Sequence, residues 1–172
     1  MINMKVILYM AMTANGMIAR ENEKTGWPQE EWNNYHEIVS KIGNIIIGRR
    51  TFEIMRDCKE FERIGNPLTI VVTNKSMPNM GKFIFVKSPL EAIKILEKKG
   101  FKKAIVAGGG KLNSSFMKEN LIDEIFLDVE PKIFGRGIKL FSDNDFEFEL
   151  ELIDIKKFSQ NELQIHYKVK KL

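Results

Sequence analysis

The chain has 172 residues, of which 44% are apolar and 29% are charged, and it carries a net charge of +4. This length suits one domain with a substantial core, and the composition is that of an ordinary globular protein. The dispersed lysines form no basic stripe and no apolar run reaches the roughly 20 residues that span a bilayer, so we expect neither a nucleic-acid nor a membrane partner.

Apolar runs alternate with helical patterns along the first three quarters of the chain. Helices are expected to start at Pro28 and Pro89, because proline is favoured in a first helical turn, and to stop at Gly43 and Gly100. The apolar runs predict strands that are buried on both faces, as in a parallel sheet covered by helices. These expected strands are Lys5–Met12, Asn44–Ile47, Leu68–Thr73, Phe83–Val86, Ala104–Ala107 and Glu124–Val129. We interpret the first of them as a strand rather than a signal peptide, because no small-residue cleavage site follows it.

The last quarter of the chain has a different pattern. From Phe146 to Leu152, and again from Leu163 to Val169, apolar and polar residues alternate strictly. This alternation predicts two antiparallel strands with one face on the core and the other in water. Together the patterns predict a single α/β domain over residues 1–172, with a mostly parallel central sheet, flanking helices and an antiparallel C-terminal edge.

Three consecutive glycines, Gly108, Gly109 and Gly110, stand between a buried run and a helical pattern. Such a run is costly, because each glycine loses more backbone freedom on folding than any other residue. One explanation is functional: bare amide groups at the positive end of a helix bind a phosphate. The other is a tight turn where the helix packs closely on the sheet. The motif alone leaves both open, and it matches neither standard nucleotide-binding fingerprint.

A second segment, Gly48-Arg49-Arg50-Thr51, also joins a strand to a helix. Two guanidinium groups and a hydroxyl at that position suit a phosphate monoester. As plain surface residues the arginines would be disfavoured, since cations belong at the other end of a helix. Two phosphate-type loops in one small domain indicate a nucleotide with separated phosphates, and a pyrophosphate with a ribose 2′-phosphate describes NADPH.

These motifs resemble two families of reductases. "IIIGRRTFE" resembles the glycine-arginine-lysine-threonine-aromatic motif of dihydrofolate reductases. "MAMTANGMIA" and "IVAGGGKLNSSFMKENLIDEIFLDVEPKIFG" resemble the pyrimidine reductases of riboflavin biosynthesis, the C-terminal domains of bifunctional deaminase-reductases. The resemblance extends from Val6 to about Phe141. It implies the dihydrofolate reductase-like fold, NADPH across the carboxyl ends of the strands, a heterocyclic substrate in the adjoining cleft, and a homodimer.

The same resemblance assigns ligand contacts. The nicotinamide would lie near Ala11, Thr13 and Ile18, the 2′-phosphate near Gly48, Arg49, Arg50 and Thr51, the adenosine near Thr73 and Asn74, and the pyrophosphate on Gly108, Gly109, Gly110, Lys111 and Leu112. A substrate phosphate would meet Lys132 or Arg136, in a loop that borders the active site of the resembled enzymes. The alternative for that loop is a plain turn.

Hydride transfer also needs a proton donor for the atom on which charge develops. Dihydrofolate reductases carry a carboxylate on the helix before the glycine-arginine motif. That register falls on Trp32 here, so Glu31 and Glu30 before it are the candidates, and Glu31 is the expected donor. Asn15 stands where the riboflavin reductases usually have an aspartate. It is either a member of the catalytic site or a turn residue, because Asn-Gly is a strong turn former.

The sequence therefore predicts an NADPH-dependent reductase of a ribosylamino-pyrimidine phosphate. Two alternatives stay open: a dihydrofolate reductase, suggested by "GRRTFE", and an NADPH-binding module without catalysis, consistent with Asn15. Two histidines and one cysteine without metal-ligand spacing predict no metal site. The single Cys58 fits a reducing compartment, so we expect a cytoplasmic protein.

Overall fold

The computed structural model describes residues 3–172, which form an eight-stranded sheet, a small two-stranded sheet and five helices. The large sheet contains β1 (Lys5–Thr13), β3 (Asn44–Gly48), β4 (Leu68–Val72), β5 (Phe83–Val86), β6 (Lys103–Val106), β7 (Glu124–Glu130), β9 (Leu150–Lys157) and β10 (Leu163–Val169). The small sheet pairs β2 (Met17–Ala19) with β8 (Ile138–Lys139). The helices are α1 (Gln29–Ile42), α2 (Arg49–Asp57), α3 (Glu60–Arg63), α4 (Pro89–Lys98) and α5 (Gly110–Lys118).

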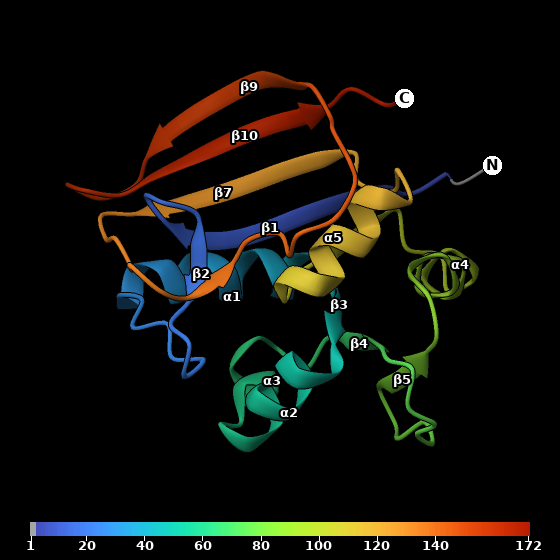
Figure 1. Ribbon diagram of the computed structural model, residues 1–172. Helices are drawn as coiled ribbons and strands as arrows, with labels where there is room; N and C mark the ends of the chain where they lie inside the picture. Colours follow the sequence, from blue (N-terminus) through green and yellow to red (C-terminus); the bar gives the residue numbers. More distant parts are fainter. Residues whose placement is uncertain (1–2) are drawn as a thin grey trace.

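The strand order of the large sheet is β5-β4-β3-β6-β1-β7-β10-β9, and Figure 1 shows it running from β9 at the top to β5 at the lower right. All neighbours from β5 to β7 pair in parallel. Only β10 runs antiparallel, against β7 on one side and β9 on the other. The predicted α/β fold, with its mostly parallel sheet and antiparallel edge, is confirmed.

Local sequence signals set the helix boundaries. The Ser88 hydroxyl caps α4 by accepting a hydrogen bond from the Glu91 amide at 3.2 Å, and Pro89 takes the first turn. Pro28 occupies the cap position of α1, so this helix begins one residue later than expected. Gly43 ends α1 with a φ of 80°, in the left-handed region that favours glycine.

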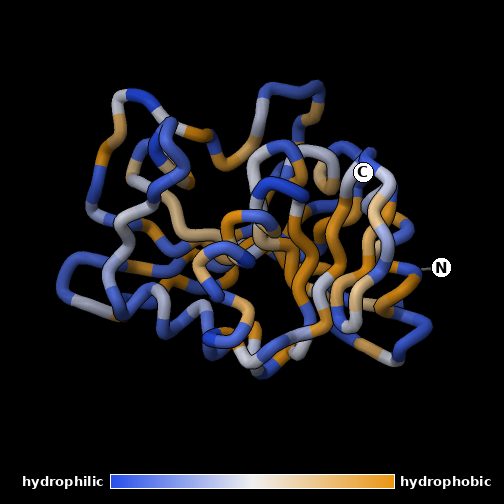
Figure 2. Tube along the Cα trace, turned by 90° about the horizontal axis from the view of Figure 1, so that it is seen from below, coloured by the Kyte–Doolittle hydropathy of each residue, from blue (hydrophilic) through white to orange (hydrophobic). Residues whose placement is uncertain are grey.

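Two separate apolar cores cover the two faces of the sheet. The helices α4 and α5 bury Leu96 and Phe116 against one face, while α1, α2 and α3 bury Val39, Phe52 and Phe61 against the other. Figure 2 shows the apolar segments gathered at the centre, with hydrophilic loops around them. Strands of this kind need apolar side chains on both faces, which explains the continuous runs in the sequence.

The C-terminal hairpin differs from the expected one. The first strand begins at Leu150 rather than Phe146, because Phe146 and Phe148 leave the ladder and pack against the α4–α5 core. Apolar and polar residues alternate along β9 as expected, but neither face of the strand is buried: Leu152 is 53% and Ile155 is 55% exposed. The reason is position, since β9 is the outermost strand.

The parallel strands all point their carboxyl ends to one edge of the sheet, where the glycine and arginine segments lie. The two-stranded sheet stands beside the end of β1 and carries the chain back from the loop at 131–137. None of the helices within residues 3–172 is long and apolar enough to cross a membrane.

Candidate functional site

A cavity of about 1420 Å³ opens at the carboxyl ends of the parallel strands. Its wall includes Ala11 from β1, Gly48 from β3, Thr73 after β4 and Gly108 after β6. Open α/β sheets bind their ligands at this edge. The volume exceeds the roughly 300–1,000 Å³ that is usual for one small ligand, so the cavity has room for two molecules side by side.

The three glycines after β6 differ in what surrounds them. A Cβ on Gly110 would lie 2.4 Å from the carbonyl oxygen of Lys139, so the start of α5 packs closely against the returning chain. A Cβ on Gly109 would meet only the Thr51 hydroxyl, at 3.8 Å, and this residue lines the cavity. Gly108 has a φ of 95°, and its carbonyl accepts a hydrogen bond from the Gly48 amide at 2.9 Å. Close packing therefore accounts for Gly110, while Gly109 leaves its backbone open to the cavity.

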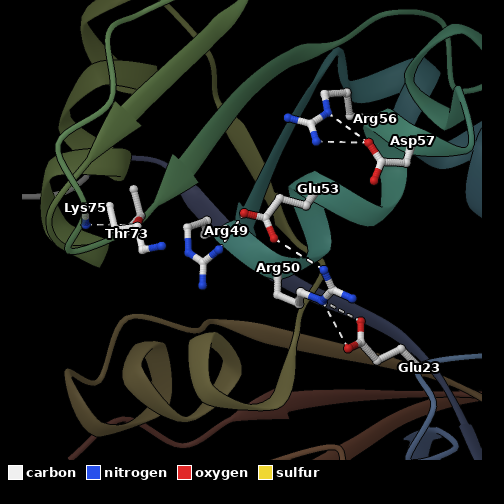
Figure 3. A network of polar contacts seen from close by, with 8 residues as sticks. All are labelled: Glu23, Arg49, Arg50, Glu53, Arg56, Asp57, Thr73 and Lys75. Carbon is white, nitrogen blue, oxygen red and sulfur yellow. Dashed lines mark hydrogen bonds and ion pairs between the residues drawn. The ribbon is translucent and has the colours of Figure 1, made fainter.

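Arg49 and Arg50 begin α2 and line the same cavity. Arg49 Nη1 pairs with Glu53 Oε1 at 2.5 Å, and Arg50 Nε pairs with Glu23 Oε2 at 2.7 Å. Figure 3 shows Glu53 between the two arginines and Glu23 on the far side of Arg50. Ion pairs this open to solvent contribute little stability because water screens them. An incoming phosphate can therefore replace either glutamate.

A buried carboxyl group lines the cavity elsewhere. Glu31, in the first turn of α1, is only 2% exposed, and no donor in residues 3–172 reaches its Oε2 atom. Asp128 on β7 lies close enough for its charge to act on Glu31. Burial, followed by the charge of Asp128, raises the pKa of Glu31 to about 10. At neutral pH the cavity therefore presents a protonated carboxyl group.

Asp128 itself is fully buried and accepts two hydrogen bonds. The Tyr9 hydroxyl donates to its Oδ2 atom, and Gln164 Nε2 donates to Oδ1 at 2.8 Å. Burial, followed by the Asp128 charge, raises the pKa of Tyr9, which remains a donor. A second buried acid on β7, Glu130, has its pKa raised to about 7 by burial and by the neighbouring Glu162. Neither glutamate of this second pair lines the cavity.

The cavity brings together most of the cofactor residues expected from the sequence. These are Ala11, Ile18, Gly48, Arg49, Arg50, Thr51, Thr73, Asn74, Gly108, Gly109, Gly110, Lys111 and Leu112. Thr13 is fully buried instead and does not line the cavity. Its hydroxyl donates to Asn15 Oδ1 at 2.6 Å and accepts from the Met17 amide at 2.9 Å, so it fixes the turn after β1.

Three other expected residues lie away from the cavity. Asn15 Nδ2 donates to the Phe134 carbonyl at 2.8 Å, and Asn15 Oδ1 accepts from the Phe134 amide, so Asn15 makes the turn that was its alternative. Lys132 Nζ donates to the Gly26 carbonyl at 2.5 Å. Arg136 is exposed in the same loop. The loop that carries Lys132 and Arg136 folds onto the β1–α1 connection, and the expected ligand contacts of all three residues stay predictions.

Sequence reasoning missed the aromatic wall and the acid behind Glu31. Trp27, Trp32 and Tyr35 line the cavity, as does Lys87 before α4. Asp128 did leave a signal, since a charged residue inside the apolar run "EIFLDVE" needs a partner when the strand is buried. Within residues 3–172, no three histidine, cysteine, aspartate or glutamate side chains are placed to hold a metal ion.

Comparison with known proteins relates the chain to one protein family. A family model of the RibD C-terminal domain matches residues 4–163. The chain is 30% identical over 170 residues to the uncharacterized protein YwjB of Bacillus subtilis, covering 95% of this chain and 97% of that protein.

Solved structures share the fold. A putative riboflavin biosynthesis protein from Shewanella sp. PV-4 aligns with a TM-score of 0.81 at 20% identity, over 98% of this chain and 100% of that one. The diaminohydroxyphosphoribosylaminopyrimidine deaminase/5-amino-6-(5-phosphoribosylamino)uracil reductase of Thermotoga maritima aligns with a TM-score of 0.74 at 20% identity, over 98% of this chain and 57% of that one. The dihydrofolate reductase-like fold expected from the sequence is thereby confirmed.

Replacing Glu31 by glutamine should stabilise the protein, increasingly so as pH rises. The pKa of Glu31 is about 10 in the folded protein against an ordinary 4.5, so between these values the folded chain binds more protons than the unfolded chain. The unfolding free energy of the wild type therefore falls as pH rises through this window, whereas glutamine has no proton to lose. We expect Tm to differ little at pH 5 and to be at least about 3 °C higher for Glu31→Gln at pH 9, equivalent to about 1 kcal/mol.

The neighbouring Glu30 provides the control, since it is exposed. Glu30→Gln should follow the wild-type Tm at every pH. If Glu31→Gln and the wild type lost stability in parallel between pH 5 and 9, the pKa of Glu31 would not be raised in the folded protein.

Proposed function

The chain belongs to the RibD C-terminal domain family, and we propose that it is an NADPH-dependent reductase of a ribosylamino-pyrimidine phosphate in riboflavin biosynthesis. Family membership supports a reductase of the riboflavin pathway. The cofactor and the substrate are inferred from one observation: the arginine loop at 48–51, the glycine loop at 108–110 and the buried Glu31 line the same cavity.

The donor chemistry of the cavity fits NADPH. Gly109 leaves room for a diphosphate to reach backbone amides at the start of α5, where the helix end favours negative charge. Arg49 and Arg50 offer guanidinium groups for a 2′-phosphate. When bound, NADPH would supply a hydride from its nicotinamide ring. The remaining space, beside Trp32 and Tyr35, suits a flat heterocycle.

Glu31 would complete the reaction as the proton donor. In the open, imine form of the substrate, the ribose carbon gains a hydride and the electron pair of the C=N bond moves to nitrogen. That nitrogen takes the proton of the Glu31 carboxyl group, and the resulting carboxylate regains a proton from water. Because Arg63 of α3 lines the cavity and Lys132 and Arg136 do not, we propose Arg63 as the partner of the substrate phosphate.

An assay of NADPH oxidation tests the proposal with the pyrimidine ribose phosphate and dihydrofolate at equal concentration. We expect turnover of the pyrimidine and little or none of dihydrofolate. Glu31→Gln should lower kcat at least about 100-fold, the lower bound for a general acid, while Glu30→Gln should leave it unchanged. Robust dihydrofolate turnover that disappears in Glu31→Gln would identify a dihydrofolate reductase. Tight NADPH binding without turnover of any substrate would identify a binding module.

Cofactor choice depends on the arginines. NADPH should bind more tightly than NADH by about 1.5–3 kcal/mol, the range for hydrogen bonds to a charged group. Arg49→Ala should remove most of this preference and leave NADH affinity alone. Arg56→Ala is the matched control, because Arg56 belongs to the same helix but pairs with Asp57 and does not line the cavity.

Gly109→Val should weaken the binding of both NADPH and NADH at least tenfold. Nicotinamide fluorescence gives the affinities, and equal values for the two nucleotides would refute the assignment.

We also propose that two copies of the chain pair through β9. β9 is an edge strand with an unpaired side, which is a template for pairing with another chain, and it exposes the apolar side chains of Leu152 and Ile155. Sedimentation equilibrium should give twice the mass of one chain, and Ile155→Lys should give a monomer. Ile133→Lys, at a 74% exposed position outside the sheet, should keep the dimer. A wild-type protein that stays monomeric would rule out this interface.

A further inference from the structure

Behind Glu31 lies a set of side chains to which the proposed reaction assigns no role. Asp128 is fully buried on β7, with Tyr9 from β1 and Gln164 from β10 on either side of it. Tyr9 donates its hydroxyl hydrogen to one oxygen of Asp128, and Gln164 donates an amide hydrogen to the other. Both donors are neutral, so they stabilise a charge on Asp128 without cancelling it.

The geometry decides which carboxyl group of the pair is ionised. Both oxygens of Asp128 accept a hydrogen bond, one from Tyr9 and one from Gln164. Glu31 has an Oε2 atom that no described donor reaches, and its side chain is buried. Two adjacent carboxyl groups in a low dielectric cannot both ionise readily, so the pair holds one proton at neutral pH. That proton belongs on Glu31.

We propose that Asp128 is a positioning residue: held as a carboxylate by Tyr9 and Gln164, it keeps the shared proton on Glu31, the member of the pair that lines the cavity. The use of this proton in catalysis rests on the proposed function, but its location is a property of the protein alone.

The electrostatic surroundings of Glu31 act in one direction. Asp128 and Glu130 from β7 and Glu162 before β10 all raise the pKa of Glu31, after burial itself. A free glutamate would be only about 0.2% protonated at pH 7, from its ordinary pKa near 4.3. Burial and the charge of Asp128 thus keep Glu31 in the acid form that a donor needs.

Infrared titration of the protein without nucleotide or substrate tests this. The wild type should keep a protonated carboxyl band at about pH 8, and Glu31→Gln should lose it. Asp128→Asn, which removes the charge and nearly keeps the shape, should lower the titration midpoint of Glu31 by at least one pH unit. Glu130→Gln, a matched loss of another buried acid from the same strand, should lower it by less.

A second, independent variant is Tyr9→Phe, measured with isotope-labelled glutamate so that the bands of glutamate and aspartate can be told apart. Tyr9→Phe removes one donor from Asp128, so part of the protonated band should move from labelled glutamate to unlabelled aspartate. A band that stays wholly on glutamate would overturn the role of Tyr9. An unchanged Glu31 midpoint in folded Asp128→Asn, or no protonated band in the wild type at pH 8, would overturn the proposal as a whole.

Turnover measurements keep the two hypotheses apart. In an active enzyme, the alkaline limb of the kcat/KM profile should move to lower pH in Asp128→Asn by the same amount as the infrared midpoint. Because the titration uses neither NADPH nor a pyrimidine, a protein that turns over nothing would contradict the proposed function while the infrared result still judges the proton pair.

Discussion

The parallel pairing of β1, β3 and β6 is the constraint on which the site depends. Parallel strands end at a common edge, so loops that lie far apart in the sequence open into one cavity. The backbone hydrogen bond of 2.9 Å from Gly48 to Gly108 ties the arginine loop to the glycine loop at that edge. An antiparallel arrangement of the same strands would send the two loops to opposite edges, and neither loop alone would accommodate a dinucleotide.

Two regimes of electrostatics meet in this cavity. Arg49 and Arg50 are paired with glutamates at the surface, where water screens the pairs and lets another anion take their place. Glu31 and Asp128 are buried, where Coulomb forces are stronger than at the surface. A proton on Glu31 removes the repulsion that two neighbouring carboxylates would have there. The exposed ion pairs of Arg49 and Arg50 suit the binding of an anion, and the buried Glu31–Asp128 pair, which retains a proton, suits proton transfer.

Most of the parallel half of the fold could be predicted from the sequence, because its signals are local. The strand at Phe83–Val86 and the helix stop at Gly43 follow from an apolar run and from a left-handed backbone position. Lys132 and Arg136 could not be placed this way. Their loop is directed by β2 and β8, strands of three and two residues that are too short to show any pattern. The alternation in β9 misled for a related reason, because whether one face is buried depends on the neighbours that the sheet order supplies.

Glu31 on α1 and Glu130 at the end of β7 are both buried, but their positions give the same effect of burial different consequences. Burial raises the pKa of both Glu31 and Glu130, and no donor in the described residues reaches Glu31 Oε2 or either oxygen of Glu130. Glu130 faces a second glutamate and does not line the cavity, so its proton is not available to a molecule bound there. Glu31 faces a carboxylate that two neutral donors hold in place, and it lines the cavity. A buried acid without a cation lowers the stability of a fold, and natural proteins accept such a cost chiefly at functional sites. The arrangement around Asp128 is therefore better explained by a need for a proton at the cavity than by any need of the sheet.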